Sequence, residues 1–276
     1  MVIQHNMAAA NTNRQLGITT GRLGKSTEKL SSGYKINRAG DNAAGLSISE
    51  KMRGQIRGLD QASVNAQDGI SLIQTAEGAL NETHAILQRM RELTVQASND
   101  TNASEDRDAI QKELTQLTTE VNRIAKETEF NTKKLMNGEL SGASNILNLQ
   151  VGANKGQNIS FNIGDMRASS LGVKDVATGV ASYASATANI SVVDAAIKKV
   201  SDQRSTLGAL QNRLEHTIAN ADNTSENLQA AESRIRDVDM AKEMVKYSKD
   251  NILQQAAQSM LAQANQSTQG VLSLLQ

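Results

Sequence analysis

The stretch "ISLIQTAEGALNETHAILQRM", residues 70–90, carries the pattern that decides the fold. Its aliphatic residues keep the alternating three-and-four spacing that lines them up along one side of an α-helix. The stripe starts upstream and shifts by one step inside the stretch; its members are Met52, Ile56, Leu59, Ser63, Ala66, Ile70 and Ile73, then Ala76, Leu80, Leu87 and Met90. A stripe of this length predicts a long helix that packs its apolar side against other helices.

Two more segments show the same spacing. One runs through Ile110, Leu114, Leu117, Val121 and Ile124, and the other through Ile190, Val193, Ile197, Val200, Leu207, Leu210, Leu214, Ile218, Leu228 and Ile235. The polar break "SNDTNASE" at 98–105 separates the first two helices, and Asn102 or Ser104 is the expected cap of the second. The Ser/Ala/Gly/Thr-rich stretch 176–188 is the expected exposed loop.

Between these helices the apolar period changes from helical to two. Leu147, Leu149 and Val151 alternate with polar residues, and a second alternating run follows the turn-like "GANKGQN". That second run contains Ile159, Phe161 and Ile163. The pattern predicts a β-hairpin.

The two ends of the chain carry weaker stripes. The N-terminal seam is Ala9, Leu16, Leu23 and Leu30, and the C-terminal seam is Leu253, Ala257, Met260, Ala264, Ser267, Val271 and Leu274. Neither stripe is strong enough to hold an isolated helix in water. Folding the chain back on itself would place residues 1–40 beside 236–276. The predicted fold is mainly α: a long antiparallel helical rod with a terminal coiled coil and a small β-hairpin region near 140–175.

The composition excludes several classes of protein. The 276 residues include 29 basic and 29 acidic side chains, no cysteine and no proline. Balanced charge gives no general attraction to nucleic acid, and the lack of cysteine excludes disulfides and Cys-bound zinc. No apolar run approaches the ~18 residues of a membrane span. The start has no basic stretch followed by an apolar run, so these facts alone suggest an intracellular protein.

No motif of catalytic chemistry emerges. "LGKST" at 23–27 resembles the end of a phosphate-binding loop, but Thr19 stands where that loop needs glycine. His84 and His216 lie on helices that can face each other, which allows a bridging metal, although solvated histidines are the far commoner case. The sequence therefore predicts no enzyme, no cofactor and no metal site.

One dense stretch, "LQRMRELTVQ" at 87–96, leaves two interpretations open. It surrounds Leu93 and Val95 with Arg89, Arg91 and Glu92. This arrangement is typical of a helix with an apolar face and salt-bridging neighbours, and equally of a recognition patch. Composition does not decide between them.

Longer stretches resemble the two signatures of bacterial flagellins. The N-terminal one is "KLSSGYKINRAGDNAAGLSISEKMRGQIRGLDQASVNAQDGISLIQTAEGAL" at 29–80, and the C-terminal one combines "LGALQNRLEHTIANADNTSENLQAAESRIRDVDMAKEM" at 207–244 with "ILQQAAQSMLAQANQSTQGVLSLLQ" at 252–276. The family commonly has a proline near Thr268 and a basic residue where this chain ends in Gln276. Both replacements leave helix propagation intact.

The resemblance implies a filament subunit that self-assembles for swimming motility. It implies two domains, a terminal coiled-coil core of 1–40 plus 236–276 and a helical rod of 41–235, with the outer variable domains absent. It implies secretion through the flagellar export apparatus into the extracellular filament, which overturns the intracellular suggestion. The alternative functions are a non-polymerising coiled-coil adaptor or secreted interaction protein and, third, an enzyme carried on a flagellin frame.

The resemblance also implies partners and site residues. Besides further copies of the chain, the partners are a flagellar secretion chaperone, the filament cap and hook–filament junction proteins, and host Toll-like receptor 5 for the monomer. The expected polymerisation and chaperone seam comprises Leu253, Met260, Leu261, Ala264, Val271, Leu272, Leu274 and Leu275, with Ile252 beside it. The receptor residues carried over by motif are Arg89, Leu93 and Glu113.

Overall fold

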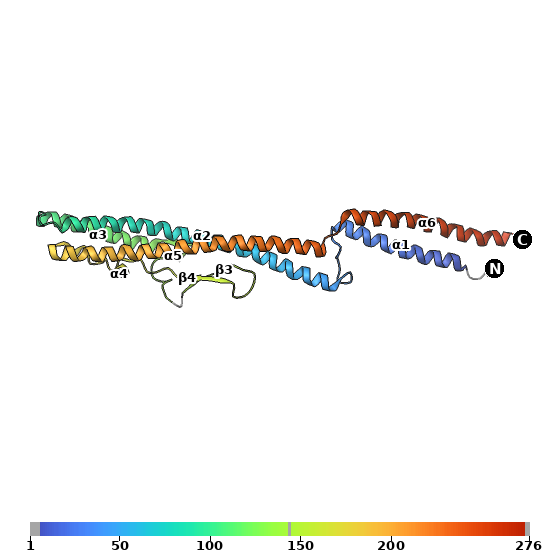
Figure 1. Ribbon diagram of the computed structural model, residues 1–276, viewed down its shortest axis with the longest axis horizontal. Coiled ribbons are helices and arrows are strands. Elements are labelled where there is room, and N and C mark those ends of the chain that lie inside the picture. The colour runs from blue at the N-terminus through green and yellow to red at the C-terminus, as the bar shows by residue number, and fades with distance from the viewer. Residues whose placement is uncertain (1–5, 143–144, 274–276) are drawn as a thin grey trace. The chain divides into compact units, whose positions relative to one another are not determined.

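Long helices make up most of the chain (Figure 1). The computed structural model describes residues 6–142 and 145–273, and the side chains in these ranges as far as residue 266. The elements are α1 (Met7–Ser32), α2 (Ala43–Ala97), α3 (Ser104–Glu127), β1 (Glu129–Phe130), β2 (Lys133–Lys134), β3 (Leu147–Gln150), β4 (Asn158–Phe161), α4 (Ala168–Leu171), η1 (Thr178–Val180), α5 (Tyr183–Arg236) and α6 (Met240–Ser273). The mainly α fold with antiparallel helices is confirmed.

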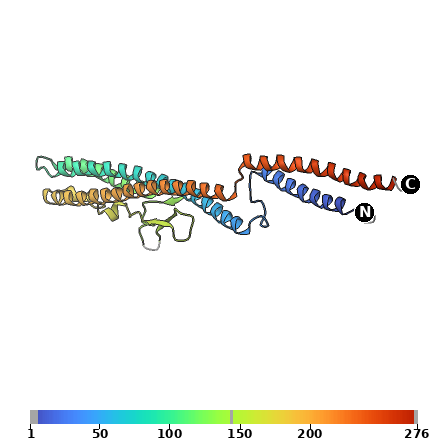
Figure 2. The ribbon, with the colours of Figure 1, turned by 45° about the vertical axis from the view of Figure 1, so that its right-hand side comes forward.

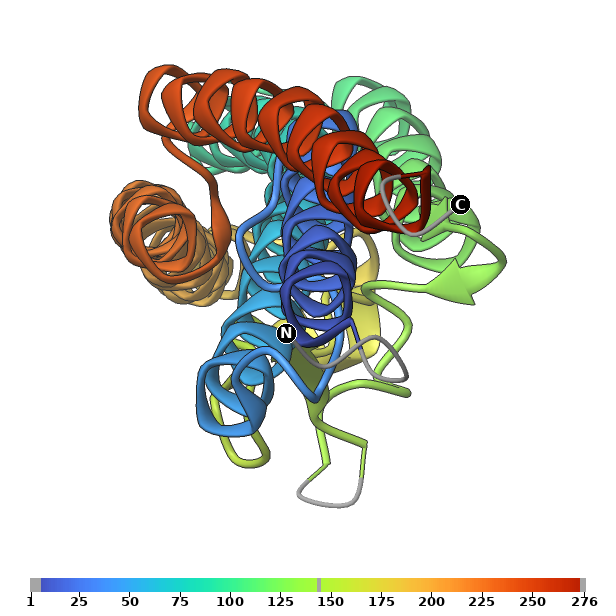
Figure 3. The same cartoon turned by 90° about the vertical axis from the view of Figure 1, so that its right-hand side faces the viewer.

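The chain forms two compact units. The terminal unit combines the two ends of the chain, Met1–Gly54 and Asn227–Gln276, and the central unit is Gln55–Glu226. In the terminal unit, α1 packs lengthwise against α6 (Figure 1), and the two helices are also neighbours when viewed from the ends of the chain (Figure 3). Among the described residues, no helix combines the length and the apolar character needed to cross a membrane.

The core of the central unit is built from α2, α3 and α5 together with the β3–β4 hairpin and the segments that flank it. The stripes predicted from the sequence supply it: fully buried side chains include Ile73, Leu80, Leu87, Met90, Leu114, Val121, Val193, Val200, Leu207 and Leu214. Burying a side chain of this size contributes about 1.5–3 kcal/mol. The three-and-four spacing therefore identified the residues that hold the central helices together.

Polar pairs show that α2 and α5 run in opposite directions in the central unit. The ion pair Arg91–Asp194 has a 2.6 Å contact. Toward the start of α2, Ser225 Oγ donates a 2.9 Å hydrogen bond to Asp60 Oδ1. Partner numbers on α5 rise as those on α2 fall, as an antiparallel pair requires.

The predicted β-hairpin is present and packs on α2 (Figure 2). Leu147 pairs with Phe161 and Leu149 with Ile159, in antiparallel register. The side chain of Asn65 on α2 donates a 3.1 Å hydrogen bond to the carbonyl of Gln150. A second two-stranded sheet, β1–β2, was not predicted, because its strands have two residues each.

Two local predictions were wrong. The residue before α3 is Ala103, and its backbone N–H donates to Asp106 Oδ2 at 3.1 Å, so neither Asn102 nor Ser104 is the N-cap. The carboxylate of Asp106, in the first turn of α3, thus accepts a hydrogen bond from the backbone N–H of the N-cap residue, as in a capping box.

The stretch 176–188 is not simply an exposed loop. It contains η1 and the start of α5, and Val176, Ala177, Val180 and Ala186 are buried. Small side chains let this backbone pack close to α3, which explains why a composition typical of loops is found next to the core.

Candidate subunit interface

The face that α1 presents to α6 alternates aliphatic and hydroxyl side chains. Its least exposed positions follow a strict three-and-four rhythm: Ala9, Thr12, Leu16, Thr19, Leu23, Ser26 and Leu30. The four aliphatic members are the N-terminal seam predicted from the sequence. The three hydroxyl members were missed, because a search for apolar spacing passes over serine and threonine.

The matching face of α6 is mostly polar. Its less exposed side chains also repeat at four and three: Glu243, Tyr247, Asp250, Gln254, Ala257, Leu261 and Ala264. This register divides the predicted C-terminal seam: Ala257 and Ala264 lie on the face toward α1, whereas Leu253 is 42% exposed and Met260 is 62% exposed. The larger apolar side chains of the predicted stripe lie off this face, because the side that meets α1 mostly pairs polar groups.

Glu243 shows how this polar seam is held. Its side chain is buried and accepts a 2.7 Å hydrogen bond from Ser26 Oγ and a 3.0 Å one from Lys246 Nζ. Burial alone would raise the pKa of this carboxyl, but the bonds from Ser26 and Lys246 outweigh it and hold the pKa below its usual value. At the other end of the pair, Asn6 Nδ2 donates to the carbonyl of Ala264 at 2.9 Å.

Outside the face that meets α1, α6 exposes several large apolar side chains. We call them together the outer ridge: Met244, Val245, Ile252, Leu253 and Met260. Val245 is 70% and Ile252 is 66% exposed. Several exposed large apolar side chains on one helix favour a surface that another molecule covers.

The last predicted seam residues lie at the C-terminal end of α6 and beyond it. Leu274 and Leu275 lie outside the described residues, and so do the side chains of Val271 and Leu272. The outer ridge leads along α6 toward this tail.

The predicted receptor residues lie on α2 and α3 of the central unit. Arg89 pairs with Glu113 at 2.9 Å and with Glu92 at 3.1 Å, and the hydrogen bond that Arg89 donates to Glu113 raises the pKa of Arg89. Leu93 is only 2% exposed and belongs to the core. That burial contradicts its predicted role as an apolar surface contact, while Arg89 and Glu113 remain accessible.

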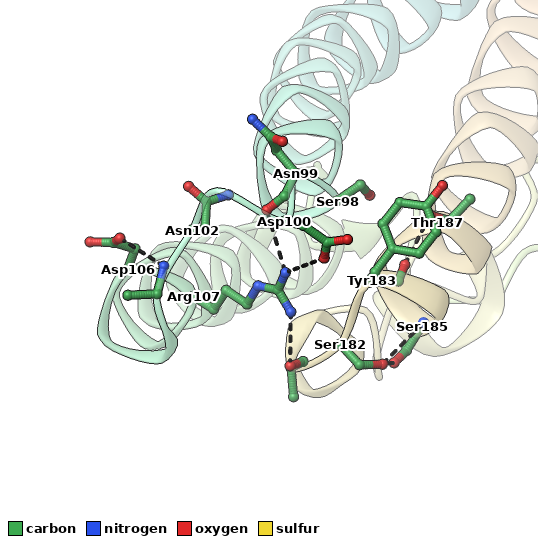
Figure 4. A network of polar contacts seen from close by, with 12 residues as sticks. Ser98, Asn99, Asp100, Asn102, Asp106, Arg107, Ser182, Tyr183, Ser185 and Thr187 are labelled. Carbon is green, nitrogen blue, oxygen red and sulfur yellow. Dashed lines mark hydrogen bonds and ion pairs between the residues drawn. The ribbon is translucent and has the colours of Figure 1, made fainter.

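A polar network at the end of the central unit was not anticipated (Figure 4). Arg107 donates to the carbonyl of Ala181 at 3.2 Å and to the carbonyl of Asn99 at 3.4 Å, and it pairs with Asp100 at 3.3 Å. One guanidinium thus joins the α2–α3 turn to the chain entering α5. The sequence offered no signal for this role, since Arg107 resembles any charged residue on a helix surface.

The two described histidines lie in different surroundings. His84 lies beside Gln88 on its own helix, and His216 lines an open groove of about 810 Å³ between the β3–β4 hairpin and α5. No group of three or more potential metal-ligating side chains occurs among the described residues.

Comparison with known proteins yields a consistent set of matches. The family model of the bacterial flagellin N-terminal helical region matches residues 3–141, and that of the C-terminal helical region matches residues 190–275. The chain is 57% identical to a flagellin of Halalkalibacterium halodurans and 54% identical to a flagellin of Bacillus subtilis, over the full length of both chains in each case.

Two solved structures are also similar. The crystal structure of Bacillus cereus flagellin is 30% identical and matches with a TM-score of 0.48, over 61% of this chain and 94% of that one. A putative flagellar hook-associated protein from Vibrio parahaemolyticus is 14% identical and matches with a TM-score of 0.59, over 72% of this chain and 98% of that one. The second likeness concerns the fold alone.

Proposed function

Since the chain belongs to the bacterial flagellin family and is a structural, non-enzymatic subunit of the extracellular filament, we propose that its terminal unit makes the contacts between subunits. In this proposal, residues 1–40 and 236–276 form the core of the filament and 41–235 surround it. The outer ridge of α6 lies against the next copy. The outer variable domains of longer family members are absent.

The single observation that carries this proposal is the exposure of the outer ridge. Each such side chain gains about 1.5–3 kcal/mol when it is buried, so five of them on one helix favour a covering partner. In a homopolymer, another copy of the same chain covers the outer ridge of each subunit. A head-to-tail contact that does not close into a ring continues as a helical filament.

Paired substitutions test the ridge. We expect Ile252→Asp together with Met260→Asp to abolish filament growth from seeds, because an unpaired charge in a dry interface costs several kcal/mol. Gln258→Asp is the matched control, since it places the same carboxylate on an exposed position of α6 between the ridge and the seam. Filament growth by the double variant at the rate of the control would contradict the proposal.

The same ridge is the proposed chaperone site before secretion. A flagellar secretion chaperone would cover Ile252, Leu253 and Met260, together with Leu261 from the face that otherwise meets α1 and with Val271, Leu272, Leu274 and Leu275, keeping these side chains from premature contact with other copies. A chain ending after Arg236 is expected to lose chaperone binding in a pull-down, and undiminished binding would place the site elsewhere. The other proposed partners are the flagellar export apparatus, the filament cap and the hook–filament junction proteins.

A receptor contact at Arg89 and Glu113 is proposed for the free subunit. The pair combines a fork of hydrogen-bond donors with an accessible carboxylate, which suits a small polar contact on Toll-like receptor 5. Leu93 is not part of this surface.

A further inference from the structure

Two chain connections lie against each other in the terminal unit. Residues 33–42 connect α1 to α2, and residues 237–239 connect α5 to α6, at the same end of the α1·α6 pair (Figure 2). The N–H of Lys35 donates to the carbonyl of Arg236 at 2.7 Å, and the N–H of Val238 donates to the carbonyl of Gly33 at 3.0 Å. These two bonds form an isolated antiparallel β-bridge between Tyr34 and Asp237.

The side chain of Arg236 lies across this bridge. It contacts the α1–α2 connection and α2 directly, and it is linked to α5 through Ser49. Its guanidinium carbon lies 4.7 Å from the centre of the Tyr34 ring, in cation–π geometry. The same guanidinium pairs with Glu50 on α2 at 2.9 Å and donates to Ser49 Oγ at 3.4 Å. Ser49 in turn donates to Glu232 Oε1 on α5 at 3.0 Å.

This contact differs from an ordinary surface ion pair. The side chain of Arg236 is 13% exposed, whereas exposed ion pairs are weakened by water and salt. Its Nε is buried and has no hydrogen-bond partner among the described residues, which is a cost rather than a gain in stability. A planar group that stacks on a ring and binds a carboxylate at once fixes direction as well as distance.

We propose that Arg236 is a positioning residue for polymerisation: it clamps the two connections, so that α1 and α6 leave the ends of α2 and α5 together and in one register. This inference rests on the proposed function of the terminal unit. It adds that ordering of α1 and α6 is coupled, because opening either connection removes a partner from the other. An incoming subunit with an open clamp would present α1 and α6 to the filament out of register.

Seeded filament growth by the full-length chain tests the clamp. Arg236→Ala is expected to raise the critical concentration for growth about tenfold relative to the parent. Arg234→Ala is the matched control, because it removes the same side chain from an exposed position two residues earlier on α5. Arg236→Lys keeps the charge near Glu50 but not the planar stack, and it is expected to fall between the parent and Arg236→Ala.

A double-mutant cycle separates positioning from simple stabilisation. Tyr34→Phe keeps the ring and should grow like the parent, whereas Tyr34→Ala should resemble Arg236→Ala and add little to it, since both remove one contact. Thermal unfolding of the central unit should be the same in all of these variants. Growth of Arg236→Ala at the same critical concentration as the Arg234→Ala control overturns the clamp. A loss of stability of the central unit in Arg236→Ala that is large enough to explain its impaired growth also overturns it.

Seeded filament growth also distinguishes a failure of the clamp proposal from a failure of the ridge proposal. If ridge variants stop growing while Arg236→Ala grows like Arg234→Ala, the clamp is wrong and the proposed function stands. If ridge variants grow normally while Arg236→Ala and Tyr34→Ala are impaired and coupled, the ridge is wrong and the clamp stands.

Discussion

Thr132 has a backbone conformation that β-branched residues rarely adopt. Its φ is 65° and that of Asn131 is 48°, so both central residues of the β1–β2 turn are left-handed. Asparagine tolerates this region, but threonine there costs about 1–2 kcal/mol. The turn matches the twist of a two-residue hairpin, which explains why the strain persists.

We expect Thr132→Gly to stabilise the central unit by about 0.5–1 kcal/mol. Removing the strain gains more than the extra freedom of glycine in the unfolded chain costs. Chemical denaturation measures the difference, with Thr132→Asn expected between glycine and the parent. A lower stability of the glycine variant would show that the turn is not strained by its side chain.

Glu243 gives the seam between α1 and α6 a dependence on pH. Its pKa in the folded chain lies below the usual glutamate value of 4.5, so the ionised form stabilises the folded pair. The sign follows from linkage: the contribution is fully present above the usual value and is lost as pH falls through the lower folded pKa. Acid should therefore loosen this seam.

Glu243→Gln should weaken the dependence of filament dissociation on acid. The amide cannot titrate, so the variant loses some stability near neutral pH and less of it on acidification. Sedimentation of filaments between about pH 7 and about pH 3 measures this, with exposed Glu226→Gln as the control. Parallel acid curves for parent and Glu243→Gln would assign the acid response to other carboxylates.

At the scale of elements, glycines on α2 mark where the hairpin region lies. A Cβ added to Gly58 would meet Ala153 Cβ at 2.8 Å and Ala153 Cα at 3.2 Å. At Gly69 an added Cβ would overlap the side chain of Leu149. Glycine lowers the helix propensity at these two positions, but because it has no side chain the hairpin can pack close to α2.

Two alanine substitutions on α2 should therefore have opposite effects. Gly58→Ala is expected to cost about 1–3 kcal/mol, because the backbone of Ala153 has to move. Gly78→Ala is expected to gain about 0.5–1 kcal/mol, since nothing lies within 4 Å of an added Cβ there. Thermal unfolding of both variants measures the contrast, and stabilisation by both would mean that the hairpin does not pack on Gly58.

The polar seam also predicts how the terminal helices behave before assembly. Hydroxyl and amide pairs contribute little net stability, so α1 and α6 should exchange their amide hydrogens quickly in the free monomer. In the filament the same amides should become slow, while α2 and α5 of the central unit are slow in both states. Strong protection of both terminal helices in a verified monomer would contradict this expectation.

Sequence patterns predicted elements well where apolar side chains alone do the packing. The stripes through Leu80, Leu114 and Leu207 are buried as expected, and so is the hairpin residue Ile159. The apolar patterns did not predict the contacts in which polar groups pair, because Ser26 and Glu243 resemble surface residues until their partners are known. Arg107 and Arg236 were missed for the same reason: each joins segments far apart in the sequence.

At the scale of the whole molecule, the receptor proposal concerns the free subunit. Arg89→Ala should reduce signalling by monomers through Toll-like receptor 5 more than it reduces stability, since Arg89 is half exposed and held by Glu92 and Glu113. Arg91→Ala is the matched control, because it also removes a half-exposed arginine from an ion pair on α2. Reporter cells given equal monomer concentrations make the comparison, and equal signalling by the parent and Arg89→Ala would assign Arg89 a structural role.

The alternation of aliphatic and hydroxyl side chains on α1 has a consequence for the timing of assembly. A seam of leucines would hold α1 against α6 firmly in every free chain, long before a filament end is reached. The weaker seam with Thr12, Thr19 and Ser26 lets the two helices separate and pair again in the free chain, so their lasting arrangement waits for the filament. Free chains are then less prone to start filaments away from an existing end.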